Sequence, residues 1–283
     1  QLDRLKSRAI ELELRINAEL FGEARVIACT LTGAANRVLD GMKFSTLFID
    51  EAAQALEAAC WIPIRKVSRV IFAGDHQQLP PTVKSVAALK AGLGKTLMER
   101  IVENKPEVVT LLQVQYRMND SIMQFSSREF YGGKLQTAPE IKHRGILDYD
   151  IPISWYEVPL ADEEGKVAGD ETINVHREKW GKEEFVGESF GRVNKAEAEL
   201  TLQHLELYFS RIGKQRILDE RIDVGIISPY RAQVQLLRRL IRKREYFKPF
   251  RHLISVNTVD GFQGQERDVI IISLVRSNDD GQI

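Results

Sequence analysis

Short, β-branched apolar segments alternate with longer helical stretches over most of this sequence. We predict strands in six segments, at residues 25–30, 46–49, 69–73, 224–228, 253–257 and 269–274. Each segment is almost continuously apolar, as strands covered on both faces of a parallel sheet are. Because strands that alternate with helices form βαβ units, the pattern predicts an α/β fold with parallel sheets. An amphipathic helix is expected before them, at about residues 1–20.

The length and composition indicate a globular protein with two domains. A chain of 283 residues is longer than one hydrophobic core usually organises. Hydrophobic residues make up 43% of it, yet no apolar run approaches the ~20 residues that a membrane-spanning helix needs. The charged N-terminal segment QLDRLKSRAIELELR is unlike a signal peptide. We therefore expect no membrane association and an intracellular, cytoplasmic protein, with a nuclear location left open.

Opposite charges balance over the whole chain but not along it. The 40 Lys and Arg residues match 40 Asp and Glu residues, so any nucleic-acid contact has to be local. Residues 161–188 hold nine acids and four bases, and we interpret 161–186 as an inserted surface hairpin or loop. Residues 231–251 hold eight bases against Glu245. Helical spacing explains these bases as a solvated face opposite a core stripe, which we prefer to a nucleic-acid patch.

Two adjacent carboxylates, Asp50 and Glu51, directly follow the predicted strand at 46–49. Ligands collect at the carboxyl ends of strands in a parallel sheet, so both acids are expected at a ligand site. In nucleotide hydrolysis an aspartate holds Mg²⁺, usually through water, while a neighbouring glutamate orients or deprotonates the attacking water. Asp50 fits the first role and Glu51 the second. The alternative is a helix N-terminus whose dipole the two acids complement.

The predicted strand at 69–73 runs into the sequence GDHQQLPP, which starts at Gly74. Glycine and paired prolines fix a turn there, and we expect its polar residues at the same edge of the sheet as the two acids. Gln78 is a candidate γ-phosphate sensor, because an amide donates to phosphate and accepts from water without changing its charge. Taken alone, the segment also fits an ordinary turn with Asp75 and Gln78 solvated.

Two further motifs complete an ordered set. The four motifs, in sequence order, are DEAAQ, GDHQQLPP, QYRMN and VDGFQGQERD. In this order they closely resemble the Upf-like DNA and RNA helicases of superfamily 1B, which have an AAA-type core. The resemblance covers nearly the whole chain apart from 161–186. It implies a P-loop NTPase fold with two RecA-like parallel-sheet lobes, both incomplete, at 1–114 and 115–283.

The resemblance also implies roles for residues at the nucleotide. Asp50 is expected to hold Mg²⁺ through water, Glu51 to activate the attacking water, and Gln78 to sense the γ-phosphate of ATP. Arg117 is the expected arginine finger, reaching from the second lobe, because its charged fork bridges phosphate oxygens as negative charge shifts. Gly264 and Glu266 belong to the expected nucleotide site, where Glu266 touches the ribose or gates the lobes.

The family further implies a monomeric motor that binds ATP and Mg²⁺ between the lobes and steps along single-stranded RNA or DNA, 5′ to 3′. The contacts with the strand are largely to phosphate and sugar. The residues expected along its path are Thr30, Thr32, Pro229, Tyr230 and Thr258. The choice between RNA and DNA and the direction of travel are not readable from these residues.

No phosphate-binding P-loop of the form GxxxxGK[ST] occurs in these 283 residues. The segment that ends in Gly94-Lys95-Thr96 imitates its end, but the motif needs a glycine where Leu89 stands and a strand before it. We therefore assign Lys95 to the surface. The family's final arginine motif is expected beyond Ile283. Accordingly, we interpret the chain as a helicase core fragment that is inactive by itself.

Two alternatives of other classes stay open. One is a nucleic-acid- or protein-binding module that keeps the motor fold without catalysis, and the other is the motor part of an ATP-driven nuclease. Flanking sequence distinguishes the motor from the module. An upstream lysine loop and a downstream arginine motif favour the motor, whereas their absence from the gene favours the module.

Overall fold

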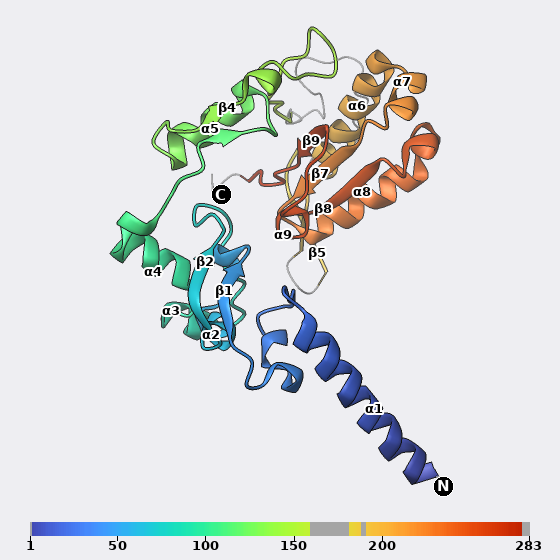
Figure 1. The fold of residues 1–283 in the computed structure, drawn as a ribbon. Coiled ribbons are helices and arrows are strands. Elements are labelled where there is room, and N and C mark those ends of the chain that lie inside the picture. Colours follow the sequence, from blue (N-terminus) through green and yellow to red (C-terminus); the bar gives the residue numbers. More distant parts are fainter. Residues whose placement is uncertain (1, 159–180, 188–190, 279–283) are drawn as a thin grey trace. The chain divides into compact units, whose positions relative to one another are not determined.

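The computed structural model describes residues 2–158, 181–187 and 191–278, and the chain divides into two compact units. Unit 1 spans Gln1–Leu111 and unit 2 spans Leu112–Ile283. Both units are mixed α/β and contain small parallel sheets (Figure 1).

The helices and strands of unit 1 are α1 (Leu2–Glu23), β1 (Phe44–Ile49), α2 (Glu57–Ile64), β2 (Val67–Phe72), α3 (Val86–Lys90) and α4 (Leu97–Asn104). Its 3₁₀ turns are η1 (Gly33–Ala35), η2 (Arg37–Leu39), η3 (Ala52–Gln54) and η4 (Pro106–Val108). Unit 2 contains β3 (Val114–Gln115), α5 (Asp120–Phe130), β4 (Gln136–Thr137), β5 (Glu184–Val186), β6 (Gly191–Val193), α6 (Lys195–Ile212), α7 (Lys214–Asp219), β7 (Val224–Ser228), α8 (Arg231–Lys243), β8 (Ile254–Thr258), α9 (Val259–Phe262) and β9 (Val269–Ile272). Its 3₁₀ turns are η5 (Pro139–Ile141) and η6 (Glu245–Phe250).

The sheet of unit 1 pairs β1 with β2 in parallel, with Ile49 opposite Phe72. These strands confirm the predictions at 46–49 and 69–73. The strand predicted at 25–30 is wrong, because this segment forms no ladder and β1 and β2 pair only with each other in the part of the chain that the structure describes. An apolar, β-branched segment becomes a strand only when a neighbour accepts its hydrogen bonds.

The three-stranded sheet of unit 2 has the order β8-β7-β9, with both outer strands parallel to β7, and β3 pairs with β4 in a separate parallel sheet. On one face, Val224 and Ile226 join the main core, to which α6 and α8 contribute (Figure 1). On the other face, the ring of Phe262 lies so close to Gly225 that a Cβ there would meet it at 2.3 Å. The middle strand is therefore covered on both sides, as its apolar sequence predicts.

Strands β1 of unit 1 and β9 of unit 2 are not covered on both faces, although their apolar sequences predict that they are. The side chain of Phe48 on β1 is 70% exposed, and that of Ile272 on β9 is 60% exposed. An apolar sequence identifies these segments as strands, but the layers packed against them decide which faces are buried. The expectation that all strands are covered on both faces is therefore wrong for β1 and β9.

A buried polar network fastens α8 to α6 and to the end of β9. The side chain of Gln233 is fully buried, accepts from the Asn194 backbone N–H at 3.0 Å and donates to the Ser273 hydroxyl at 3.0 Å. That hydroxyl donates in turn to Glu197 at 2.6 Å. Because each buried polar group has a partner, the network fixes one arrangement of these elements.

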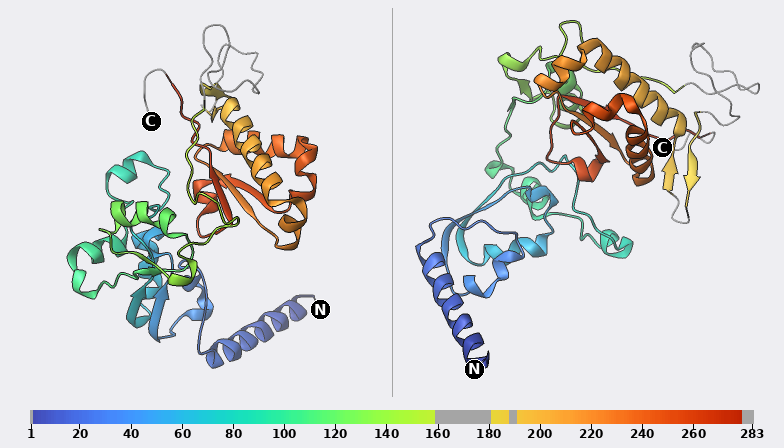
Figure 2. Two further views of the ribbon diagram at one scale, coloured as in Figure 1. Left: turned by 90° about the horizontal axis from the view of Figure 1, so that it is seen from above. Right: turned by 90° about the vertical axis from the view of Figure 1, so that its right-hand side faces the viewer.

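The predicted N-terminal helix is confirmed as α1, which contains no buried residue. It extends away from the β1–β2 pair in Figure 1 and in both views of Figure 2. Neither α1 nor any other helix among the described residues is both long enough and apolar enough to cross a membrane.

Residues 161–180 of the insertion predicted at 161–186 lie outside the described residues. Its last part forms β5, which pairs antiparallel with β6. The structure therefore describes a small two-stranded sheet at the end of the insertion.

Candidate functional site

The carboxyl ends of β1 and β2 lie side by side, and the chain stays hydrogen-bonded beyond both strands. The Ala73 N–H donates to the Ile49 carbonyl at 2.8 Å, and the Ala52 N–H donates to the Ala73 carbonyl at 2.9 Å. Asp50 and Glu51 occupy the turn between these two bonds. The sequence therefore places its paired acids at the edge of a parallel sheet where ligands collect.

Gly74 allows the two loops to approach this closely. A Cβ at this position would lie 2.9 Å from the backbone nitrogen of Ala52 and 3.1 Å from that of Ala53. Both neighbours are main-chain atoms beside the acid turn, so they have little freedom to withdraw. The glycine of the GDHQQLPP motif thus has a packing role next to Asp50 and Glu51.

We expect Gly74→Ala to destabilise unit 1 by roughly 1–3 kcal/mol, because the added methyl group forces the acid turn away from the end of β2. Urea unfolding of the purified chain, followed by circular dichroism, measures the change. Gly22→Ala is the matched control, since a Cβ at Gly22 meets nothing within 4 Å and alanine favours the helix. Equal midpoints for both variants would disprove the packing role.

Glu51 has a left-handed backbone, with φ 51° and ψ 39°. This conformation is uncommon for a residue with a side chain, and such outliers cluster at functional sites. Local bonds hold the turn: the Glu51 N–H donates to Asp50 Oδ1 at 3.0 Å, and Gln54 Nε2 donates to Glu51 Oε2 at 3.2 Å. Both carboxylates are exposed, so solvent and a ligand can reach them.

Gln78 lies in the turn after β2 and is also exposed. Its Nε2 donates to Asp75 Oδ2 at 2.9 Å, and its backbone N–H donates to the Asp75 carbonyl at 3.1 Å. Within the described part of the chain, no hydrogen bond joins Gln78 to Asp50 or Glu51. The turn that was predicted after the strand at 69–73 is therefore present and contains Gln78. The role of Gln78 as a phosphate sensor stays a prediction.

The Gly94-Lys95-Thr96 segment caps a helix. The buried Thr96 hydroxyl accepts from the Glu99 N–H at 3.1 Å, and Glu99 Oε2 accepts from the Thr96 N–H at 2.7 Å, a capping box at the start of α4. Lys95 forms an ion pair with Glu103, and its side chain is 39% exposed. The prediction that Lys95 lies at the surface is confirmed.

In unit 2, Arg117 forms an ion pair with Glu266 at a distance of 2.7 Å from Nε to Oε2. Gln115 shapes the turn that carries Arg117, because its Oε1 accepts from the N–H groups of Arg117 and Met118 at 2.8 and 2.7 Å. Its Nε2 donates to the Met118 carbonyl at 2.7 Å. Two predicted site residues, 149 positions apart, therefore meet in this unit.

Thr258 ends β8 and caps α9. Its hydroxyl accepts from the Gly261 N–H at 3.3 Å, while Asn257 Nδ2 donates to the Gly261 carbonyl at 2.9 Å. Gly264 follows the helix with φ +75°, a left-handed conformation that glycine adopts at little cost. Among the described residues, no hydrogen bond has the Thr258 hydroxyl as its donor, so this hydroxyl can donate to the oxygen of a ligand.

Pro229 and Tyr230 follow β7 directly, and Ser228 at the end of β7 lies opposite Thr258 in the sheet register. The three predicted strand-path residues of unit 2 therefore share one sheet edge. Those of unit 1 are exposed, and their hydroxyl oxygens are 3.5 Å apart. They are Thr30, at the end of the segment 25–30 where the predicted strand is wrong, and Thr32, two residues after it.

Some residues that organise the site were not predicted from the sequence. Gln115 and Asn257 hold backbone turns through their amides, and both stand within or beside the recognised motifs. The sequence feature that could have identified them is a carboxamide side chain next to the end of a strand. Such a side chain can accept from a backbone N–H and donate to a backbone carbonyl at the same time. Gln233 gave no such signal, since its partners are distant in sequence.

The predicted basic face of residues 231–251 is wrong in part. Arg244 is half-buried and pairs with Glu199 and Glu206 of α6, so it is not simply solvated. Arg238 donates twice to the Val256 carbonyl on β8, at 3.0 and 2.6 Å. The core stripe is confirmed by the buried residues of α8. Long arginine stems allow charges to reach around a helix to neighbouring elements.

Comparison with known proteins identifies the family. A family model described as an AAA domain matches residues 93–283, and a second with the same description matches residues 1–86. The chain is 36% identical over 284 residues to an uncharacterized ATP-dependent helicase of Methanocaldococcus jannaschii, covering 99% of this chain and 39% of that protein.

Two other relatives have similar identities. The chain is 33% identical over 277 residues to DNA polymerase alpha-associated DNA helicase A of Schizosaccharomyces pombe, covering 94% of this chain and 37% of that protein. It is 33% identical over 274 residues to ATP-dependent helicase NAM7 of Saccharomyces cerevisiae, covering 96% and 26%. The chain thus spans less than half the length of these relatives. It belongs to the AAA-domain helicases, in the Upf-like group of superfamily 1B.

Proposed function

We propose that this chain is the core part of an ATP-dependent helicase that hydrolyses ATP to move along single-stranded nucleic acid, 5′ to 3′. Units 1 and 2 would be its two RecA-like lobes, both incomplete. The observation that carries the proposal is the acid turn: Asp50 and Glu51 follow a parallel strand, and Glu51 is held in a left-handed backbone beside the end of the next strand. Two exposed carboxylates in a strained turn suit the activation of water near a bound phosphate.

The donor set fits a hydrated Mg²⁺ ion. One carboxylate oxygen of Asp50 accepts the Glu51 N–H, and the group is exposed, so its other oxygen is available to water. Mg²⁺ loses its water reluctantly and is often bound through one or two carboxylates together with substrate phosphates. The ion would neutralise charge on the phosphates of ATP. Asp50 would hold it through a water molecule.

The other residues would act on the phosphates and on the attacking water. Glu51 would accept a proton from that water, and the amide of Gln78 would bond both the water and a phosphate oxygen. Arg117 would bring a permanent positive charge to the phosphates. Its present partner, Glu266, is a carboxylate in an exposed pair, which an incoming anion can replace at little cost. Glu266 and Gly264 would complete the nucleotide site.

The strand would run along the carboxyl edge of the β7–β8 pair. Thr258 would offer a hydroxyl donor there, and Pro229 and Tyr230, which follow β7 directly, would offer their rings to the strand. Such contacts read phosphate, sugar and base faces and not base identity, which suits a motor that travels along varied sequences. Thr30 and Thr32 would extend this path with two further hydroxyl groups.

The test of the proposal compares two lengths of the protein. We expect the full-length protein to hydrolyse ATP faster with single-stranded RNA or DNA and to separate a duplex that has a 5′ overhang. The 283-residue chain alone should show no stimulated hydrolysis, because no lysine loop is present to cradle the phosphates. Release of phosphate in a coupled assay measures ATP hydrolysis by the full-length protein and by the 283-residue chain. Strong turnover by the short chain, or none by the full-length protein, would contradict the proposal.

A further inference from the structure

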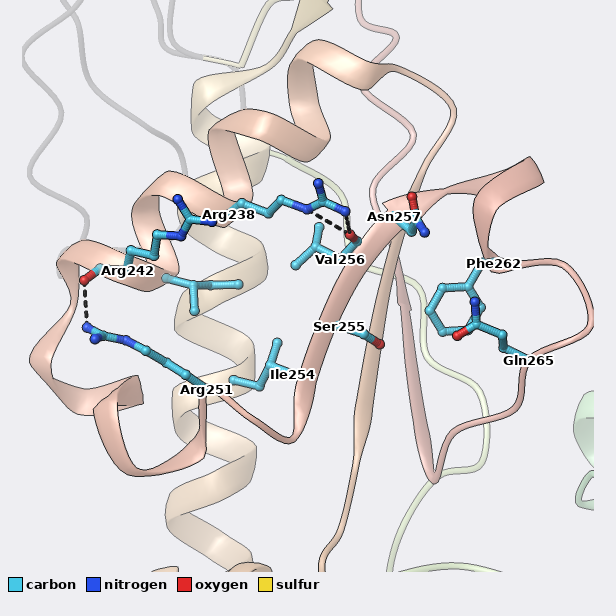
Figure 3. Close-up of a pocket in the computed structure, with 10 residues that line it drawn as sticks. Arg238, Arg242, Arg251, Ile254, Ser255, Val256, Asn257, Phe262 and Gln265 are labelled. Carbon is cyan, nitrogen blue, oxygen red and sulfur yellow. Dashed lines mark hydrogen bonds between the residues drawn. The ribbon is translucent and has the colours of Figure 1, made fainter. Parts of the chain in front are cut away.

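The second half of α8 and the outer edge of β8 enclose a groove of about 390 Å³ in unit 2 (Figure 3). Three arginines line it, Arg238 and Arg242 from the helix and Arg251 from the segment before β8. Polar side chains of β8 and of the segment after α9 line the same groove, and they include Asn257 and Gln265. The helix and the segment before β8 thus present three guanidinium groups to a single cavity.

These charges are not neutralised within the groove. Among its lining residues, all of them in the described part of the chain, there is no Asp or Glu. The adjacent Arg244 differs, because it reaches two carboxylates on α6. Arg238 and Arg251 donate instead to backbone carbonyls, which fix the guanidinium groups but leave their positive charge uncompensated (Figure 3). The groove is therefore a preorganised cationic surface.

Two of the three arginines are held in place. Both Nε and Nη2 of Arg238 donate to the Val256 carbonyl, a group on the open edge of β8. Nη2 of Arg251 donates to the Arg242 carbonyl at 2.5 Å, while its Nε is buried and has no hydrogen-bond partner in the described structure. A buried donor without an acceptor is costly, and an acceptor supplied by a ligand would remove that cost.

Arg242 differs from Arg238 and Arg251 in its contacts. Its side chain is exposed, and no hydrogen bond or ion pair involves its guanidinium among the described residues. Figure 3 shows its guanidinium on the groove side of α8, between the other two arginines. The guanidinium group of an arginine in this position can donate two hydrogen bonds to a bound anion.

We propose that this groove binds the phosphodiester backbone of single-stranded nucleic acid, as an extension of the strand path at Thr258. This inference rests on the proposed function. The groove runs along β8 from Ile254 to Asn257, the residue before Thr258, so it is continuous with that path. At about 3.3 Å per residue, this stretch is about 10 Å long, which is more than one phosphate needs. Asn257 Nδ2 and Gln265 Nε2 each donate one N–H to the Gly261 carbonyl, at 2.9 and 3.0 Å, so the second N–H of each amide can donate to a sugar oxygen beside the phosphates.

The test measures binding of a labelled single-stranded oligonucleotide to the full-length protein, without nucleotide, at several salt concentrations. Arg242→Ala should weaken binding about 5- to 10-fold and make the slope of log K against log salt shallower by ~0.7, the value for one lost phosphate contact. Arg239→Ala is the matched control, since Arg239 lies on the same helix, is exposed and does not line the groove. It should leave affinity and slope unchanged.

Three outcomes distinguish a failure of the groove proposal from a failure of the proposed helicase function. If the unmodified protein binds no single strand, the proposed function itself fails. If it binds but Arg242→Ala behaves like Arg239→Ala, the groove proposal alone is overturned. If Arg242→Ala lowers affinity for a poly-glutamate peptide but not for the oligonucleotide, the groove binds acidic proteins instead. Arg242→Lys should retain part of the affinity, because it keeps the charge and loses the fork.

Discussion

In the full-length protein, Glu51→Gln should lower the turnover number for ATP by about 10²- to 10⁴-fold, the range typical of general-base catalysis. Glutamine keeps the size of glutamate and its bond with Gln54, but it cannot accept a proton from water at neutral pH. Binding of ATP and of single-stranded nucleic acid should stay near normal, because neither needs the base. Steady-state phosphate release and equilibrium binding measure these quantities separately.

The left-handed backbone at Glu51 allows a control variant, Glu51→Gly, that separates loss of catalysis from loss of stability. Glu51→Gly removes the carboxylate and also relieves the unfavourable φ angle, so it should stabilise unit 1 slightly while reducing turnover as much as the glutamine variant does. Loss of activity in a protein that is no less stable cannot be attributed to unfolding. Normal hydrolysis by either variant would show that Glu51 is not the catalytic carboxylate.

The sequence predicted those parts of the site that depend on short-range pattern. A continuously apolar segment followed by Asp50 and Glu51 predicts a parallel strand that ends in two acids, and the structure has that arrangement in β1. The strand at 224–228 was predicted from the same kind of apolar segment, and the structure has it as β7. In each case the signal lies within about ten residues, where local geometry dominates.

The remaining features depend on which segments meet in space. Residues 25–30 have the composition of a strand, but no described neighbour pairs with them. Phe48 has the composition of a core residue but lies on an uncovered face of β1. The pairing of Arg117 with Glu266 joins positions 149 residues apart, and no periodicity within one element encodes such a contact. Tertiary packing therefore decides these features, and it overrides the local preference of each segment.

Arg117→Ala in the full-length protein should lower the turnover number for ATP by roughly 10³-fold or more, the scale on which arginine fingers act. Its stability should hardly change, because the side chains of Arg117 and Glu266 are 57% and 68% exposed and an exposed ion pair contributes little to folding. The turn itself should persist, since Gln115 holds it through the backbone N–H groups of Arg117 and Met118. Single-turnover hydrolysis and thermal unfolding measure the two effects independently.

Variants at both ends of the ion pair show which partner acts on the phosphates. Arg117→Lys should restore activity only in part, because an ammonium group lacks the planar fork that bridges two oxygens. Glu266→Gln removes the partner and leaves the arginine, so its effect on turnover should be at least an order of magnitude smaller than that of Arg117→Ala. Affinity for a single strand without nucleotide should stay unchanged in all three variants. If Arg117→Ala instead hydrolyses ATP normally and loses the strand, Arg117 belongs to the nucleic-acid path.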